Sequence, residues 1–152
     1  MTNDLVSDML TRIRNASMAR HSFARVRYSK LNLAILKVLA AEGYITSYAV
    51  EKSDMGEGQI KILLKYKGWW IKKPLFSILQ RISKPGQRVF SGYKHFQDTI
   101  DVLRYDQGTA IISTSAGIVS HVKAQKLKKV VKSFVTLDKK SKREEKRNVT
   151  YW

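Results

Sequence analysis

The chain has 152 residues, with 29 Lys and Arg against 12 Asp and Glu and a formal net charge of +17. A charge of this size indicates a polyanionic partner, either nucleic acid or an anionic membrane surface. No cysteine is present, which excludes disulfides, thiolate zinc sites and thiol nucleophiles. The apolar runs are too short to span a bilayer. The 43% of hydrophobic residues suffices for a packed core, so the chain is not a disordered tail.

Two amphipathic helices are predicted in the first half of the chain. Residues 4–19 carry apolar side chains at helical spacing, with Asn3 as the candidate N-cap. Residues 30–42 repeat the pattern, beginning after Ser29 and ending at Gly43. Two strands are predicted to follow, at 44–50 and 59–66, separated by a turn-rich segment.

The second half is predicted to be richer in strands. Lys84-Pro85-Gly86 places Pro and Gly where a type II turn requires them. Val130, Val131, Phe134 and Val135 indicate a last strand. The elements predicted in this half are strands at 75–82, 88–93, 109–113 and 130–135 and a short helix at 94–104.

The fold expected from this order is α/β (α+β), in two small domains with a basic extension. Residues 1–66 form an N-terminal α-β-α-β-β unit, in which the strand between the helices has no assigned bounds. Residues 67–135 form a strand-rich unit with a short helix. Residues 136–152 form the extension, because 120–152 hold 11 Lys and Arg against 3 Asp and Glu and the segment 138–147 is almost wholly charged.

Enzyme signatures are weak in this sequence. A Ser-His-Asp triad built on Ser113 or Ser115 with His121 is not supported, because the sequence lacks the G-x-S-x-G elbow and offers no distinct third residue. The three histidines are scattered without metal-ligand spacing, and no phosphate-binding glycine loop occurs. We therefore expect no catalysis, no cofactor, no metal and no small-molecule substrate. The charged tail also has too little apolar content for a membrane-surface helix.

Three basic segments fit nucleic acid better. Residues 11–15 put guanidinium groups beside amide and hydroxyl donors, although a solvated helix face explains Arg12 equally well. Ser29 and Lys30 open a helix whose free N–H groups attract phosphate, and plain N-capping is the structural alternative. Residues 81–88 place basic side chains around a rigid turn. Trp69, Trp70, Phe90 and Tyr93 are able to stack on bases, but core packing is the default for aromatic residues at strand spacing.

The uncharged stretch Ser113-Thr114-Ser115-Ala116-Gly117 contrasts with this basic background. Charge attracts any polyphosphate but distinguishes poorly between sites. The accessible minor groove of A-form RNA presents ribose 2′-hydroxyls and base edges, which small hydroxyl side chains and bare backbone amides can read. Gly117 would allow the backbone to approach closely. We therefore expect this segment to read RNA shape while the surrounding cations supply attraction.

Five motifs in register resemble the bacterial-type small-subunit ribosomal protein eight family. They are T-R-I-R-N at 11–15, S-K-L at 29–31, E-G-Y-I at 42–45, R-I-S-K-P-G-Q-R at 81–88 and S-T-S-A-G-I at 113–118, and the resemblance runs from about residue 3 to 135.

The resemblance implies a structural protein that binds the central domain of small-subunit ribosomal RNA and neighbouring small-subunit proteins, helping to assemble the subunit. It implies Ser113, Thr114, Ser115 and Gly117 as the loop that enters the RNA minor groove. It assigns backbone contacts to Arg12, Arg14, Asn15, Ser29, Lys30, Ser83, Lys84 and Arg88.

The sequence departs from the family after the hydroxyl stretch. Residues 120–129 lack the usual T-D-[RK]-x-A-R and G-G-E patterns, and a basic segment extends to Trp152. Either 130–135 form the final strand, which we prefer, or Tyr151 and Trp152 do so after an insertion. The drift favours an organellar ribosome, mitochondrial slightly before plastid, with the bacterial cytoplasm as the alternative. A free nucleic-acid-binding module of low sequence specificity is the competing function.

Overall fold

The computed structural model describes residues 4–51, 58–68, 73–91, 108–127 and 131–139. Its elements form an α+β fold with antiparallel sheets. The predicted short helix at 94–104 lies outside the described residues, as do Asn3, Trp69, Trp70 and Tyr93. The elements are α1 (Leu5–Met18), β1 (Phe23–Arg27), α2 (Lys30–Ala41), β2 (Ile45–Glu51), β3 (Gln59–Leu64), β4 (Tyr66–Lys67), β5 (Lys73–Pro74), β6 (Phe76–Arg81), β7 (Phe90–Ser91), β8 (Gly108–Thr114), β9 (Gly117–Ser120), α5 (His121–Leu127) and β10 (Val131–Lys139).

Both predicted helices of the first half form, with local sequence fixing their ends. The N-cap of α1 is Asp4 rather than Asn3, because the Asp4 carboxylate accepts the Ser7 N–H (3.3 Å). The N-cap of α2 is Ser29 as predicted, and Ser29 Oγ accepts the Leu31 N–H (3.3 Å). The apolar stripe of each helix is buried, and Met9 and Ile35 are 0% exposed.

Helices α1 and α2 end with the same backbone geometry but with different residues. In α2 Gly43 has φ +78° and donates to the Ala40 carbonyl, and the following Tyr44 donates to Leu39. In α1 the equivalent position is Arg20, with φ +59°, which donates to Ser17. Both are Schellman caps, which normally place glycine at this left-handed position. The second cap therefore holds a strained arginine.

The first sheet has the antiparallel order β1-β3-β2. Strand β1 gives the expected α-β-α-β-β order its missing bounds. Its alternating burial places Ala24 and Val26 on the inner face, together with Ile60 and Ile62 of β3. Helix α1 packs on β1 and α2 packs on β2, so one face of this sheet is covered and the other is open to solvent.

The second sheet has the order β6-β10-β8-β9, and β7 also pairs with β10. Strand β10 occupies 131–139 between β6 and β8, so the preferred placement of the last strand near 130–135 is confirmed. It also continues four residues into the segment expected to be a tail, pairing Thr136 with Gln80 and Leu137 with Leu79.

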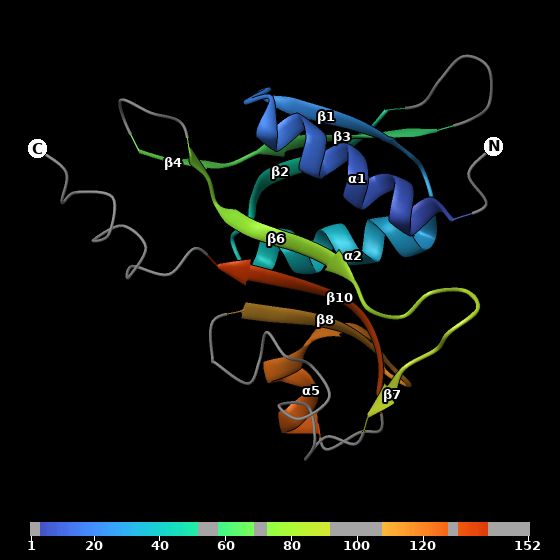
Figure 1. Cartoon of the computed structure of the whole chain (residues 1–152). Coiled ribbons are helices and arrows are strands. Elements are labelled where there is room, and N and C mark those ends of the chain that lie inside the picture. Colours follow the sequence, from blue (N-terminus) through green and yellow to red (C-terminus); the bar gives the residue numbers. More distant parts are fainter. Residues whose placement is uncertain (1–3, 52–57, 69–72, 92–107, 128–130, 140–152) are drawn as a thin grey trace, which may run out of the picture.

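Figure 1 shows the first sheet at the top, the two helices beneath it, β6 level with α2, β10 and β8 lower still, and α5 at the opposite end from the first sheet. Helix α1 contacts both β1 and β6, and α2 contacts both β2 and β9. One core cluster joins the helices and the first sheet with Leu79 of β6 and Ile111 of β8. The core therefore extends across the expected boundary at residue 66, and the division into domains stays a prediction.

Replacing the strained cap residue by the residue that the geometry favours should stabilise the protein. We expect Arg20→Gly to raise the free energy of unfolding by about 1 kcal/mol, because a non-glycine residue in the left-handed region is disfavoured by about 1–2 kcal/mol. Gly43→Ala, at the matched position of α2, should lower it by a similar amount, and no atom lies within 4 Å of the added Cβ. Urea unfolding measures both changes, and a free energy of unfolding that moves in the same direction in the two variants would contradict the assignment.

Candidate nucleic-acid interface

The hydroxyl stretch forms the tip of the β8–β9 hairpin. Thr114 pairs with Gly117 across a turn made by Ser115 and Ala116. Gly117 has φ +110°, whereas neither turn residue has a positive φ. A residue with a side chain rarely adopts a φ of this value, which explains why glycine is needed at this position. The predicted buried strand at 109–113 is confirmed as β8, and the predicted loop is a tight hairpin turn.

The three hydroxyl side chains of the tip have different surroundings. Thr114 Oγ1 accepts the Ala116 N–H (3.1 Å) and donates to the Gly117 carbonyl (2.9 Å), so it holds the turn together. Ser113 is half-buried and lies opposite Ile118, which packs against the core. Ser115 is exposed at the apex. The tip therefore presents the Ser115 hydroxyl on a backbone that Thr114 fixes in place.

Strand β10 brings a second chain segment to the same end of the sheet. Its residues Val131 and Lys132 pair with Thr114 and Ser113 on one side. On the other side the same two residues pair with Ser91 and Phe90 of β7. Phe90 is 65% exposed. The segment that follows the Pro-Gly turn is thus placed two strands from the hydroxyl tip, although the two segments are over twenty residues apart in sequence.

The Pro-Gly turn is closed by two backbone hydrogen bonds between Lys84 and Gln87, of 2.9 and 3.2 Å. Gly86 lacks the positive φ that a type II turn requires, so the predicted turn type is wrong. Lys84, Pro85, Gly86 and Arg88 are exposed. Ser83 is only 2% exposed, so its side chain is not accessible on this surface.

Arg81, at the base of the turn, is committed to contacts within the protein. It forms an ion pair with Asp4 and donates through Nε to the Ser83 carbonyl. Burial lowers the pKa of the Arg81 guanidinium, which stays protonated at neutral pH. Its charge thus links β6 to the start of α1.

The predicted cations of α1 also have contacts within the protein. Arg12 forms an exposed i,i+4 pair with Asp8 (2.8 Å). Arg14 donates through Nη2 to the Leu79 carbonyl and so joins α1 to β6. The Asn15 side chain is exposed, while its backbone carbonyl accepts the Ala19 N–H (2.9 Å). A structural role for Arg14 was not visible in the sequence, because its partner lies 65 residues away.

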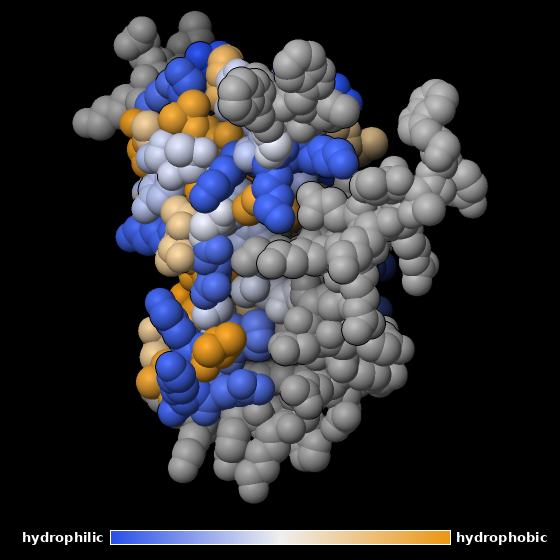
Figure 2. All heavy atoms as spheres, turned by 90° about the vertical axis from the view of Figure 1, so that its left-hand side faces the viewer, coloured by the Kyte–Doolittle hydropathy of each residue, from blue (hydrophilic) through white to orange (hydrophobic). Residues whose placement is uncertain are grey.

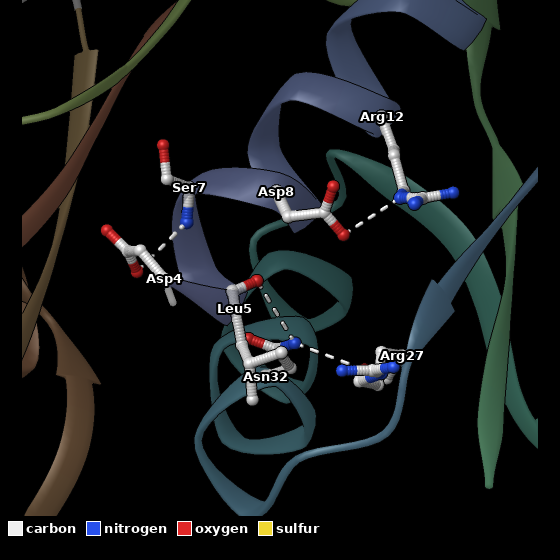
Figure 3. A network of polar contacts seen from close by, with 7 residues as sticks. All are labelled: Asp4, Leu5, Ser7, Asp8, Arg12, Arg27 and Asn32. Atoms are coloured by element: carbon white, nitrogen blue, oxygen red, sulfur yellow. Dashed lines mark hydrogen bonds and ion pairs between the residues drawn. The ribbon is translucent and has the colours of Figure 1, made fainter. Parts of the chain in front are cut away.

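Asn32 connects the beginnings of both helices to β1 (Figure 3). Its amide nitrogen donates to the carbonyls of Leu5 (3.4 Å) and Arg27 (3.2 Å), and the residue is 1% exposed. These bonds hold the backbone just ahead of Ser29 and Lys30. Lys30 itself is exposed at the first turn of α2, where a phosphate would also meet free backbone N–H groups.

The divergent residues 120–129 contain a helix that the sequence did not indicate. Helix α5 follows β9 directly, and Ala124 buries against β8. His121 Nδ1 accepts the Ala110 N–H (3.2 Å). The seven residues of α5 are too few to show a helical periodicity that would distinguish them from a loop. Helix α5 supports the face of β8 opposite the main core.

Hydrophilic side chains dominate the described surface in Figure 2, both level with the first sheet and level with α5, and apolar residues form smaller patches between them. Within the described ranges, no helix is long and apolar enough to cross a membrane, and no group of three acidic, His or Cys residues is placed to hold a metal.

The sequence comparisons identify the family. The model described as Ribosomal protein S8 matches residues 4–130. The chain belongs to the ribosomal protein S8 family. It is similar to small ribosomal subunit protein uS8c of Phaeodactylum tricornutum, with 42% identity over 84% of this chain and 92% of the relative. It is 45% identical to protein uS8 of Synechocystis sp., over 82% of this chain and 90% of the relative.

The same relatives correct one expectation. The preference for a mitochondrial over a plastid ribosome is not supported, because these relatives are plastid-type and cyanobacterial proteins, including uS8c of Gracilaria tenuistipitata at 44% identity. The relatives favour a plastid or a bacterial ribosome. The family match ends at residue 130, yet β10 begins at 131 and completes the second sheet.

The structural role of Arg14 can be tested by comparison with Arg12. Arg14→Met should lower the free energy of unfolding by about 1 kcal/mol, because the Leu79 carbonyl loses a charged donor. Arg12→Met should change it by only about 0.3 kcal/mol, since exposed i,i+4 pairs contribute little. Urea unfolding of both variants decides the point, and an unchanged stability of the Arg14 variant would show that the contact is dispensable.

Proposed function

We propose that this S8-family protein is a structural constituent of the small ribosomal subunit that binds the central domain of small-subunit ribosomal RNA. The observation that carries the proposal is the β8–β9 tip closed by Thr114, with the exposed Ser115 hydroxyl at its apex and Gly117, at positive φ, directly after the turn. Family membership supports a ribosomal, non-enzymatic role. The relatives support a plastid or bacterial ribosome as its location.

The tip is suited to a minor groove by its size and its chemistry. A hydroxyl both donates and accepts hydrogen bonds, as a ribose 2′-hydroxyl does, and the wide, shallow minor groove of A-form RNA admits a turn of small residues. Because Thr114 is bonded within the turn, the tip loses little conformational freedom on binding. We therefore assign direct reading to Ser115 and to the backbone of the turn, with Ser113, Thr114 and Gly117 shaping it.

The exposed basic side chains around the Pro-Gly turn would hold the phosphate backbone of the RNA beside the hairpin tip. Lys84 and Arg88 are exposed on the segment that leads into β7, and β7 is joined to the hairpin through β10. In this proposal Arg12, Asn15, Ser29 and Lys30 supply further backbone contacts from α1 and α2. Ser83 and Arg14 act by supporting the turn and the helix, because of the burial of Ser83 and the Leu79 contact of Arg14.

Ser115→Ala should weaken binding to a short RNA carrying the cognate central-domain helix by about fivefold, equivalent to about 1 kcal/mol for one hydrogen bond. Affinity for a scrambled duplex and the free energy of unfolding should not change. Ser7→Ala, which removes an exposed hydroxyl from α1, is the matched control. Binding titrations over a salt series measure these effects. Equal affinity of the wild-type protein for both RNAs would instead identify a charge-driven, low-specificity binder.

The role of Thr114 differs from that of Ser115 and can be separated from it. Thr114→Val should lower both stability and cognate affinity, because the two hydrogen bonds that close the turn are lost. If the Thr114 and Ser115 variants had the same stability, the turn would not depend on the Thr114 hydroxyl.

Truncation can separate the sheet from the basic segment. A chain ending at Lys139 should fold and keep its preference for cognate RNA, because all of β10 remains. A chain ending at Val135 should be severely destabilised, because residues 136–139 pair with both β6 and β8. Circular dichroism, urea unfolding and the same RNA titrations would compare the two. Loss of cognate preference in the longer truncation would transfer specificity to residues 140–152.

A further inference from the structure

The outer face of the first sheet carries an ordered array of cations with an aromatic ring. Strand register places three rows across it: Phe23–Leu63–Ser47, Arg25–Lys61–Ala49 and Arg27–Gln59–Glu51. This is the face opposite the buried Ala24, Val26, Ile60 and Ile62, which α1 and α2 cover. We call these nine residues the outer sheet face.

The side chains of the outer sheet face are open to solvent, and they include three basic residues and one acidic residue. The side chain of Arg25 is 53% exposed and that of Lys61 is 35% exposed. Glu51 lies 3.3 Å from Arg25 Nε and 4.0 Å from Lys61 Nζ. Exposed pairs at such distances are weak, so a stronger anion can compete for both cations.

Phe23 holds two of the cations on the surface of the sheet. The Arg25 guanidinium lies 5.1 Å and the Lys61 ammonium 4.9 Å from the centroid of its ring, within the range of cation–π contacts. The ring is itself 41% exposed, and the neighbouring Leu63 is 40% exposed. Cations supported in this way lose less rotamer freedom when they meet a ligand than solvated side chains do.

We propose that the outer sheet face is a second RNA-binding surface, which contacts the phosphate backbone of a ribosomal RNA segment through Arg25, Arg27 and Lys61. Charge complementarity selects RNA over a protein partner of ordinary surface composition, since the face is basic on a chain of net charge +17. The proposal rests on the proposed function. The segment is distinct from the one at the hairpin tip, because α1 and α2 separate this face from the second sheet.

The first test compares two RNAs and two charge-matched triple variants. Arg25→Gln/Arg27→Gln/Lys61→Gln should weaken binding to full-length small-subunit ribosomal RNA at least tenfold and reduce the salt slope by about two to three, one unit per lost phosphate contact. Its affinity for the short cognate helix should match that of Lys37→Gln/Lys67→Gln/Lys73→Gln, which removes three exposed cations elsewhere. Circular dichroism and urea unfolding confirm that both variants fold.

The two proposals fail separately in this design. If wild-type protein does not prefer the cognate helix, the proposed function fails. If wild-type protein prefers it but the two triple variants behave alike on full-length RNA, the outer sheet face is not an RNA-binding surface. An equal loss on both RNAs by the first triple variant also overturns the proposal, because the face would then not contact a separate segment.

A second test uses the absence of native cysteine. A single cysteine from Ala49→Cys, in the middle row, can carry a photocrosslinker or a tethered hydroxyl-radical source into reconstituted small subunits. Ala116→Cys at the hairpin tip is the positive control. We expect position 49 to modify an RNA segment different from that reached from position 116. Modification of a ribosomal protein alone from position 49 would assign the face to a protein contact and overturn the proposal.

Discussion

Strand β10 is the element on which the second half of the structure depends. It pairs with β6, β7 and β8, and so joins the Pro-Gly segment to the hydroxyl hairpin. No local interaction brings these two segments together, since residues 92–107 separate them in the sequence. Because side chains on paired strands keep fixed register, β10 also sets which residues of the two segments face the same way. The proposed RNA site therefore depends on a strand that contributes none of its assigned residues.

The charge of the protein has two uses that the structure separates. Arg14 and Arg81 lie at the contact between α1 and β6, where one meets a carbonyl and the other a carboxylate. Lys30, Lys84 and Arg88 remain exposed. The half-buried Arg81 needs its partner because desolvation of its charge is unfavourable. Arg14 is exposed, but its guanidinium already donates to the Leu79 carbonyl. The net charge thus overstates the number of cations available to RNA.

Shape and charge have complementary roles in the two proposed surfaces. The hairpin tip is uncharged and closed by Thr114, and in the proposal it would discriminate through hydrogen bonds to a groove of defined width. The outer sheet face is cationic and would contribute affinity that falls with salt. A protein with only the second kind of surface would bind many RNAs. One with only the first would bind its site weakly. The proposal for the first surface starts from the S-T-S-A-G-I motif, and the proposal for the second starts from Phe23, Arg25, Arg27 and Lys61.

The sequence by itself determined the local elements and the family. Helical periodicity, Ser29 and Gly43 were enough for α2, alternation was enough for β3, and five short motifs indicated the S8 family. Helix α5 and the two-residue strands were too short to leave a periodic signal. Tertiary structure alone decided the partner of Arg14, the burial of Ser83, the length of β10 and the alignment of the three rows on the outer sheet face. These features depend on contacts between residues far apart in sequence, which no local pattern records.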